Sequence, residues 1–233
     1  MGQTLIEAGN ENPDTEVTST HDADDDLAAA FSNVDAAIDF TVHHFTSDVL
    51  DAAISSNTPL VIGTTGHTDD ERAAIVAAAE KLPIVFAPNF SVGVNTLFYL
   101  TRKAAQILGN DRFDIEVTEM HHRHKIDAPS GTARRLLEIL NEETNTSYED
   151  DVAHGRVGNI GARPSQEIGM HTLRGGDVVG DHTVMFAADG ERVELTHKAS
   201  SRMTFASGAV RAAVWLRDKP AGLYDMQDVL GLQ

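Results

Sequence analysis

The segment from Phe113 to Leu140 constrains the fold of this chain more than any other. Its first part, Phe113–Glu119, alternates apolar and polar side chains, which predicts a strand with one buried face. From Ala133 onward, leucines recur on one side of a predicted helix, at positions 136, 137 and 140. A strand that leads through a turn into a helix is typical of layered α/β proteins.

The turn between this strand and this helix concentrates groups that can be cationic. They are His121, His122, Arg123, His124 and Lys125. The whole chain is strongly acidic, with a formal net charge of -18 at pH 7, so this cluster needs a local reason. Imidazole changes its charge near neutral pH, and lysine supplies a fixed positive charge. The cluster therefore predicts a site that holds a small anion and gives it a proton.

The start of the helix also favours an anion. Pro129 sits where a missing N–H costs little, and Ser130 is a good N-cap. The N–H groups of Gly131 and Thr132 then fall in the first helical turn, which leaves its N–H groups without helical partners and attracts negative charge. Gly131 lets an anion approach the main chain closely.

Two other interpretations of this turn stay open. It can be a solvated loop before a capped helix. Alternatively, His121, His122 and His124 can share a metal ion, as in a hydrolase. The chain has no cysteine and no His-Glu-x-x-His pattern, which argues against a metal. The placement between a strand and a Ser-Gly-Thr helix start argues against a plain loop.

The first ninety residues alternate predicted strands and helices. Strands are predicted at residues 34–42, 60–62 and 83–87, and helices at residues 3–8, 47–55 and 68–81. Thr68 and Glu71 form a capping-box pattern at the start of the last helix. This alternation implies a parallel sheet, whose ligands bind at the carboxyl ends of the strands. Gly63–Gly66 and Ala87–Phe90 lie at two such ends.

The rest of the chain changes character. A helix is predicted at residues 95–108, a polar loop at 144–166, antiparallel strands between 168 and 198, and a last helix at 205–216. Asp189-Gly190 is a strong hairpin signal between two of these strands. His182 and His197 are expected to be sheet histidines with satisfied hydrogen bonds.

Composition excludes several classes of protein. The charge of -18 comes without a basic stripe, which argues against nucleic-acid binding. The absence of cysteine excludes a disulfide scaffold. No apolar stretch has transmembrane length and no signal peptide is visible, so we expect a cytoplasmic protein that does not bind membranes. Acidity and a preference for Arg over Lys suggest a halophilic, salt-adapted surface.

Four stretches together resemble the dihydrodipicolinate reductase family. They are Gly63–Gly66, Ala87–Asn95, Glu119–Ala133 and Gly180–Arg202. The resemblance implies an α/β protein with a Rossmann-like parallel-sheet nucleotide domain, formed by residues 1–90 and 207–233. Residues 91–206 would form an inserted α+β domain, mostly antiparallel, for substrate binding and tetramerisation. Arg202 would lie near the junction, close to the cofactor.

The resemblance also implies an activity. Family members reduce 4-hydroxy-tetrahydrodipicolinate to tetrahydrodipicolinate with NADPH or NADH and loss of water, in lysine and diaminopimelate biosynthesis. His121 matches the proton donor and Lys125 a second acid, whereas His122, Gly131 and Thr132 match contacts to the small dicarboxylate substrate. The cofactor would contact Gly63, Thr64, Thr65, Ala87, Pro88, Asn89 and Phe90. The chemistry needs no metal, and a homotetramer is expected.

The start of the chain departs from the family pattern. The family begins with a strand and a Gly-x-x-Gly-x-Met-Gly turn, of which Met1-Gly2 matches only the end. We therefore expect the first strand of the nucleotide domain to be missing, and Glu16–Thr20 to be a remnant of the second. This departure leaves one alternative open, a degenerate and non-catalytic oligomer without a complete cofactor site.

Overall fold

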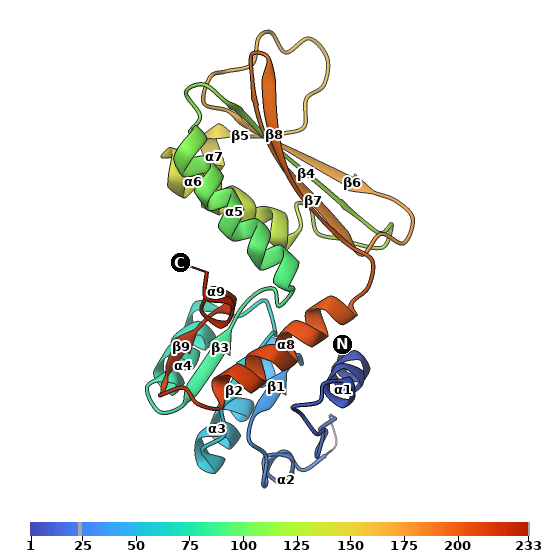
Figure 1. The fold of residues 1–233 in the computed structure, drawn as a ribbon, viewed down its shortest axis with the longest axis vertical. Coiled ribbons are helices and arrows are strands. Elements are labelled where there is room, and N and C mark those ends of the chain that lie inside the picture. The colour runs from blue at the N-terminus through green and yellow to red at the C-terminus, as the bar shows by residue number, and fades with distance from the viewer. Residues whose placement is uncertain (23–24, 233) are drawn as a thin grey trace. The chain divides into compact units, whose positions relative to one another are not determined.

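The computed structural model describes residues 1–22 and 25–232, and the chain divides into two compact units. One unit consists of Met1–Val92 and Arg202–Gln233, and the other of Gly93–Ser201. Two segments far apart in the sequence therefore build the first unit, whereas the second is continuous (Figure 1).

The sheet of the first unit is parallel throughout, as the sequence predicts. Its strand order is β1 (Ala37–Asp39), β2 (Leu60–Ile62), β3 (Pro83–Phe86) and β9 (Gly222–Tyr224). The register pairs Ile38 with Val61, and Val61 with Val85. The carboxyl ends of β1, β2 and β3 therefore lie side by side, at the edge where parallel sheets bind ligands.

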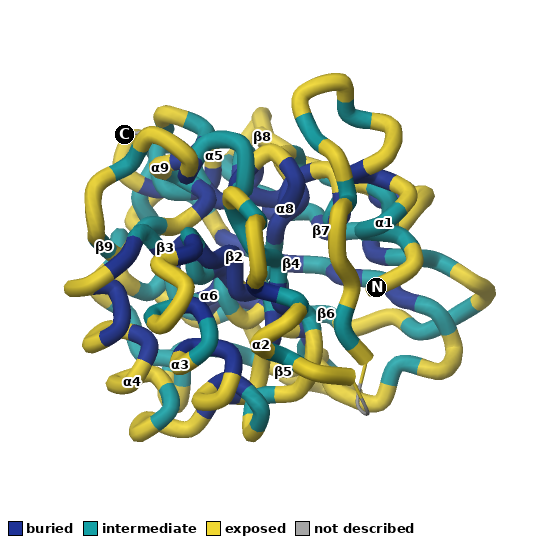
Figure 2. Tube along the Cα trace, turned by 90° about the horizontal axis from the view of Figure 1, so that it is seen from below, coloured by how far each residue is buried: buried dark blue, intermediate teal, exposed yellow. Residues whose placement is uncertain are grey.

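Helices cover both faces of this sheet. Leu60 and Ile62 of β2 pack in a cluster with α2 (Leu27–Ala30), α3 (Thr46–Ser56) and α4 (Asp69–Ala79). Val61 points to the other face and packs with α8 (Met203–Leu216) and α9 (Met226–Leu230). The helix α1 (Gly2–Glu11) packs on α8. Figure 2 shows the buried residues of β3 and α8 in dark blue. This is the two-faced layering of a doubly wound fold.

Two local predictions for the first unit need correction. The strand predicted at residues 34–42 is only Ala37–Asp39, because Phe40 folds against Gly63, where an added Cβ would lie 2.2 Å from the ring. The strand remnant predicted at Glu16–Thr20 is wrong, since these residues form no strand. Val17 instead lies against α1, close enough that a Cβ on Gly9 would meet it at 2.6 Å.

The capping box predicted at the start of α4 is confirmed. The side chains of Thr68 and Glu71 each accept a hydrogen bond from the main-chain N–H of the other. A short 3-10 helix, η1 (His43–Phe45), joins β1 to α3.

The sheet of the second unit is mixed. Its strand order is β5 (Val152–His154), β6 (Ile168–Arg174), β4 (Asp114–His121), β7 (Gly180–Ala188) and β8 (Glu191–Ala199). The pair β7–β8 is antiparallel, as the hairpin signal at Asp189-Gly190 predicts, and β4–β7 is antiparallel as well. The prediction of antiparallel strands from residue 168 onward is wrong for β6, which pairs in parallel with both β4 and β5. The crossover through α6 (Gly131–Thr144) allows β4 and β6 to run in the same direction.

Two helices cover one face of this mixed sheet. Figure 1 shows α5 (Val92–Leu108) and α6 on the same side of the sheet. Their side chains share one core with Ile115, Val117 and Phe186. The three predicted core leucines of α6, at 136, 137 and 140, are fully buried.

The polar loop predicted at residues 144–166 is partly wrong. It contains α7 (Tyr148–Asp151) and then β5. Ser147 caps α7, and Tyr148 and Val152 pack against the core of the second unit. Apart from the residues that contact the core, α7 and β5 are polar. Hydrophobic periodicity therefore does not indicate a helix or a strand there.

Candidate functional site

The strand β4 ends at His121, the first candidate catalytic residue. Its alternation places Ile115, Val117, Glu119 and His121 on the same, buried face. The first two belong to the apolar core, whereas the last two are ionisable. The buried face of one strand therefore changes from packing to polar chemistry as it approaches the turn.

Glu119 is the centre of a hydrogen-bond network at this strand end. His121 Nδ1 lies 2.5 Å from Glu119 Oε2. Arg174, the last residue of β6, donates to both oxygens of Glu119, each at 2.9 Å. The main-chain N–H of Ser130 donates to Oε1 at 3.0 Å. One carboxylate thus joins the ends of two strands to the start of α6.

This network keeps Glu119 ionised although the residue is fully buried. Burial alone would raise the pKa of Glu119, but hydrogen bonds from His121, Arg174 and the Ser130 N–H outweigh it and lower the pKa to about 2. A fixed negative charge therefore sits behind His121 at any pH near neutrality.

His182 lies next to this pair on β7, at the position opposite Glu119. Its ring meets that of His121 edge to face, with centroids 5.2 Å apart, and its Nε2 lies 3.1 Å from Ser130 Oγ. Burial lowers the pKa of His182 to about 3, and the nearby His121 and Lys125 act in the same direction. His182 is therefore neutral at physiological pH.

The prediction of satisfied sheet histidines holds only in part. The Nδ1 atoms of His182 and His197 are buried and have no hydrogen-bond partner among the described residues. For His182 the prediction is correct at Nε2, which lies near Ser130 Oγ, and wrong at Nδ1.

The start of α6 has the form that the sequence predicts. Ser130 is the N-cap, and its Oγ accepts from the N–H of Ala133 at 3.2 Å. Gly131 is exposed, and a Cβ added there would meet nothing within 4 Å. The main chain at Gly131 is therefore open to an approaching anion, at the positive end of a helix dipole. Thr132 follows as the second residue of the helix.

The remaining turn residues lie between β4 and α6. His122 follows His121 directly, and the rings of His122 and His124 are 6.2 Å apart. Lys125 Nζ donates to Asp127 Oδ1 at 2.8 Å. Arg174 reaches the same loop, since it also donates to the carbonyl oxygen of Asp127 at 2.6 Å. The guanidinium thereby connects the Lys125 loop to Glu119.

The cofactor candidates follow β2 and β3 in the first unit. Gly63 and Ala87 come directly after these strands, and their N–H groups bond the carbonyls of Asp39 and Ile62. Gly66 has φ +91°, which only glycine adopts readily. This turn exposes main chain at the ligand-binding edge of the sheet, which fits a dinucleotide.

The cofactor candidates differ in their access to a ligand. Thr65 and Pro88 are exposed and Asn89 is half-buried, so their side chains can contact a ligand. Thr64, Ala87 and Phe90 are buried. Thr64 Oγ1 donates to Asp39 Oδ2 at 3.1 Å, and the Phe90 ring packs 5.5 Å from that of Phe40. These three positions shape the turn.

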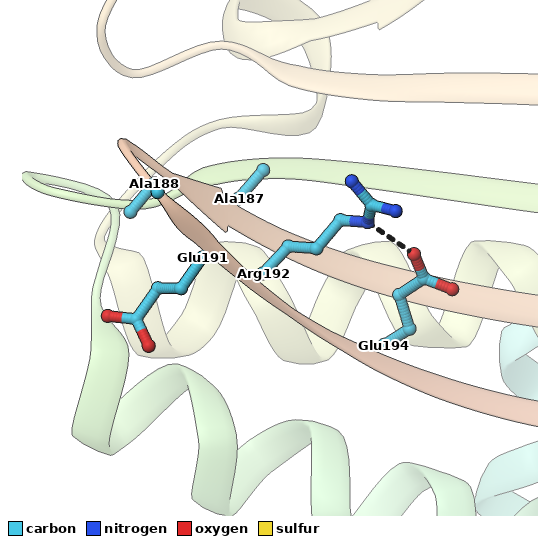
Figure 3. A pocket seen from close by; sticks show the side chains of 6 residues that line it. Ala187, Ala188, Glu191, Arg192 and Glu194 are labelled. Carbon is cyan, nitrogen blue, oxygen red and sulfur yellow. Dashed lines mark hydrogen bonds and ion pairs between the residues drawn. The ribbon is translucent and has the colours of Figure 1, made fainter.

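A hollow of about 630 Å³ lies far from His121, at the tip of the β7–β8 hairpin. Figure 3 shows its lining, where Arg192 pairs with Glu194 along β8. The hairpin end of β7 pairs with Asp114, at the opposite end of β4 from His121. Seven residue-to-residue steps along β4 separate the two ends, which is about 23 Å. The hollow has no histidine and no buried polar group, so it is not a candidate active site.

Metal ligation and membrane insertion find no support in the described part of the chain. Residues 1–22 and 25–232 hold no group of three or more His, Asp, Glu or Cys side chains arranged to bind a metal ion. Among the same residues, no helix combines the length and the apolar character that a bilayer crossing requires.

Sequence reasoning missed several members of the network around His121. Glu119 could have been found, because residues two apart on a strand share a face. Arg174 and Gly180 could not, because they reach His121 only through the pairing of β6 and β7 with β4.

Comparison with known families decides what kind of protein this is. The family model described as "Dihydrodipicolinate reductase, N-terminus" matches residues 1–90, and the one described as "Dihydrodipicolinate reductase, C-terminus" matches residues 93–230. The chain belongs to the dihydrodipicolinate reductase family. Both halves of the family match, so a non-catalytic oligomer and a metal-dependent hydrolase are not favoured.

Two curated relatives of this dihydrodipicolinate reductase family member are similar over most of its length. A 4-hydroxy-tetrahydrodipicolinate reductase from Akkermansia muciniphila is 67% identical over 232 residues, which covers 100% of this chain and 94% of that protein. One from Magnetococcus marinus is 53% identical over 208 residues and covers 89% of this chain and 77% of that protein.

Solved structures confirm the predicted fold. A dipicolinate-bound dihydrodipicolinate reductase from Paenisporosarcina sp. TG-14 superposes with a TM-score of 0.75 at 24% identity, covering 97% of this chain and 94% of that one. A putative oxidoreductase from Magnetospirillum magnetotacticum has a TM-score of 0.54 at 14% identity, covering 97% and 92%. The Rossmann-like class with a second α/β unit is therefore correct.

Proposed function

We propose that this protein is a 4-hydroxy-tetrahydrodipicolinate reductase that uses NADPH or NADH, in lysine and diaminopimelate biosynthesis. The observation that carries the proposal is the buried, ionised Glu119 behind His121, beside a helix start that is open to an anion. The 67% identity to a curated reductase over the whole chain supports the same activity.

The residues of the second unit serve the substrate. The ring of the substrate loses water to give a conjugated imine. This imine accepts a hydride and becomes an enamine. His121 gives that enamine its proton, and Lys125 provides a second acid and a positive charge. His122 and the main chain of Gly131 and Thr132 hold the carboxylates, since a helix N-terminus favours an anion.

The residues of the first unit serve the cofactor. The nicotinamide supplies the hydride. We assign its binding to Gly63, Thr64, Thr65, Ala87, Pro88, Asn89 and Phe90, at the carboxyl ends of β2 and β3. Thr65 and Pro88 contact it with exposed atoms, whereas Phe90 is buried and acts by shaping the turn that follows β3. Preference between NADPH and NADH stays open in this proposal.

Assembly and environment complete the proposal. Residues 91–206 act as the substrate-binding and tetramerisation domain of a cytoplasmic homotetramer, and residues 1–90 with 207–233 act as the nucleotide domain. The net charge of -18 suits a salty cytoplasm. Equal activity and stability in dilute and molar potassium chloride would remove the salt adaptation, and the mass of the particle in solution tests the tetramer.

The deciding experiment measures oxidation of NADPH and NADH by the purified chain, with substrate generated by the upstream dehydratase. Turnover with either cofactor is expected. His121→Gln should lower kcat with little change in cofactor affinity, because it removes the proton donor. Thr132→Pro should raise the KM for substrate and weaken inhibition by dipicolinate, because it removes an N–H from the anion-binding turn. Unchanged kcat in the first variant, or unchanged KM in the second, would contradict the corresponding assignment.

A further inference from the structure

The hydrogen bond from His121 to Glu119 determines which ring nitrogen of His121 can donate a proton to a substrate. Glu119 is ionised, and an ionised carboxylate accepts hydrogen bonds and donates none. The nitrogen 2.5 Å away, His121 Nδ1, must therefore carry its proton permanently. Nε2 is then the ring nitrogen that remains to interact with a substrate.

Glu119 itself has no freedom to change its orientation. Its two oxygens receive four donors, which are His121 Nδ1, two nitrogens of Arg174 and the Ser130 N–H. Two donors fall on each oxygen, so each lone-pair direction is used. A carboxylate held this way is a rigid anchor for the imidazole, as a positioning group needs to be.

The space on the Nε2 side of His121 is kept open by Gly180. A Cβ at that position would stand 3.0 Å from His121 Nε2. No described residue forms a hydrogen bond to Nε2, and 11% of the His121 side chain is exposed. The absence of a side chain at Gly180 therefore leaves room beside the nitrogen that does not bind Glu119.

The same carboxylate also sets the position of the anion-binding turn. Ser130 is the N-cap of α6, and its N–H is one of the four donors to Glu119. Arg174, another donor, holds the Asp127 carbonyl in the Lys125 loop. A proton donor and the helix start that would hold a carboxylate thus share a single anchor.

We infer that Glu119 is a positioning residue for the reaction. It holds His121 in the Nδ1–H form, so that Nε2 delivers the proton, and it fixes the position of His121 relative to the start of α6. The inference rests on the proposed function, because it takes His121 as the proton donor. Arg174 supports this arrangement, because it binds both Glu119 and the loop that carries Lys125.

Glu116 provides a matched control on the same strand. It lies on the opposite face of β4, binds Arg156 and Arg163, and lies 2.7 Å from His171 Nε2. Hydrogen bonds also lower its pKa to about 2 against the effect of burial. A Glu→Gln change there removes the same charge from a similar Arg and His environment, without touching His121.

The test compares Glu119→Gln, Glu116→Gln, His121→Gln and the double variant of residues 119 and 121 in steady-state kinetics. A Gln at 119 must turn its NH₂ toward two of the four donors, so the His121 anchor is lost. We expect kcat to fall about 100-fold in Glu119→Gln, within the range for general acid catalysis, and less than about twofold in Glu116→Gln. The double variant should be no slower than His121→Gln, because Glu119 acts through His121.

Imidazole ¹⁵N spectra give a readout that a purely structural role would not change. In the unaltered protein, neutral His121 should show a protonated Nδ1 and an unprotonated Nε2, and Glu119→Gln should shift it toward a mixture of both forms. If Glu119→Gln does not fold, Glu119→Asp keeps the charge but withdraws the carboxylate from His121 by one methylene, and the same loss of kcat is expected.

The outcomes separate this inference from the proposed function. Normal turnover in His121→Gln would overturn the proton-donor assignment and the inference with it. Slow turnover in His121→Gln but normal turnover in Glu119→Gln, with an unchanged ¹⁵N spectrum, would overturn the inference alone. A double variant much slower than His121→Gln would show that Glu119 acts by another route, and would also overturn it.

Discussion

The strand β4 carries two glutamate networks of similar composition, one on each face. Glu116 binds two arginines and a histidine, and its side chain is 21% exposed. Glu119 binds one arginine, a histidine and a main-chain N–H, and its side chain is 0% exposed. Both carboxylates have a pKa lowered to about 2, so charge does not distinguish them.

The difference lies in what the partners connect. Arg156 and Arg163 belong to the segment between β5 and β6, so the Glu116 network ties that segment to the sheet. The partners of Glu119 come from the end of β4, the end of β6 and the start of α6. The same residue types therefore fasten a loop to the sheet in one place, and join two strand ends to a helix start in the other. The second network is also the more deeply buried of the two.

The largest expected effect is on folding stability, when the buried charge loses its arginine. Arg174→Met leaves Glu119 buried and short of two donors, so we expect the free energy of unfolding to fall by about 3–5 kcal/mol. Arg156→Met should cost about 1 kcal/mol, because Glu116 is partly exposed and keeps Arg163 and His171. Urea denaturation at neutral pH measures both, and equal losses would break the comparison between the two faces.

The next effect is the acid sensitivity that His182 contributes. Its pKa is lowered to about 3 in the folded state, whereas the unfolded chain titrates near the ordinary histidine value of 6.5. Stability is therefore complete above pH 6.5 and is lost as the pH falls from 6.5 toward 3, since only the unfolded state binds the proton there. Between pH 6.5 and 5 this amounts to about 2 kcal/mol.

The variant His182→Asn tests that contribution through the slope of stability against pH. Between pH 7 and 5 its unfolding free energy should fall by about 2 kcal/mol less than that of the unaltered protein. The slope is compared and not the absolute stability, because the variant also loses packing. Parallel curves for the two proteins would show that His182 is not the neutral, buried group beside Glu119.

A smaller effect is expected from the helix caps. Ser130→Ala removes the N-cap of α6 and the partner of His182 Nε2, which should cost about 1–2 kcal/mol. Ser147 caps the four-residue α7 in the same way, away from the Glu119 network. Ser147→Ala should cost about 0.5 kcal/mol, the low end of the range for an N-cap, because α7 has only four residues. Thermal and urea unfolding provide the measurement, and a larger loss from Ser147→Ala would contradict this order.

The smallest loss of stability is expected for Gly180→Ala, which should nevertheless lower kcat measurably. Gly180→Ala places a Cβ 3.0 Å from His121 Nε2, so the ring must shift by a few tenths of an ångström. We expect under about 1 kcal/mol of destabilisation and a kcat about tenfold lower. Gly175→Ala is the control, because its Cβ would meet only the flexible end of Met120, at 3.3 Å. Equal kcat values for the two variants would show that the space beside Nε2 does not matter.

Much of the local structure follows from sequence patterns. Alternation in Phe113–Glu119 predicts β4, the leucines at 136, 137 and 140 predict α6, and Ser130 predicts its cap. These signals are strong because a strand or helix with one buried face imposes its own period on the sequence. Short elements such as β5 and α7 escape, because three or four residues show no period.

The candidate site could be predicted only in part. The cationic turn, the open main chain at Gly131 and the position of His121 at a strand end all follow from the sequence. The assignments of His122, Lys125 and Thr132 to the substrate stay predictions. Nothing local in the sequence indicates that Glu119 is ionised, because its pKa depends on donors that arrive from elsewhere in the chain.

The sequence by itself thus determined the family of this protein, its main helices and strands, and the turn where its charge gathers. Only the tertiary structure decided which carboxylate stands behind His121 and which ring nitrogen bonds it. The physical reason is distance along the chain, since Arg174 and Gly180 meet Glu119 and His121 through strand pairing across more than fifty residues. Such pairings are set by the packing of the whole unit, whereas a local pattern records only which face of each element is buried.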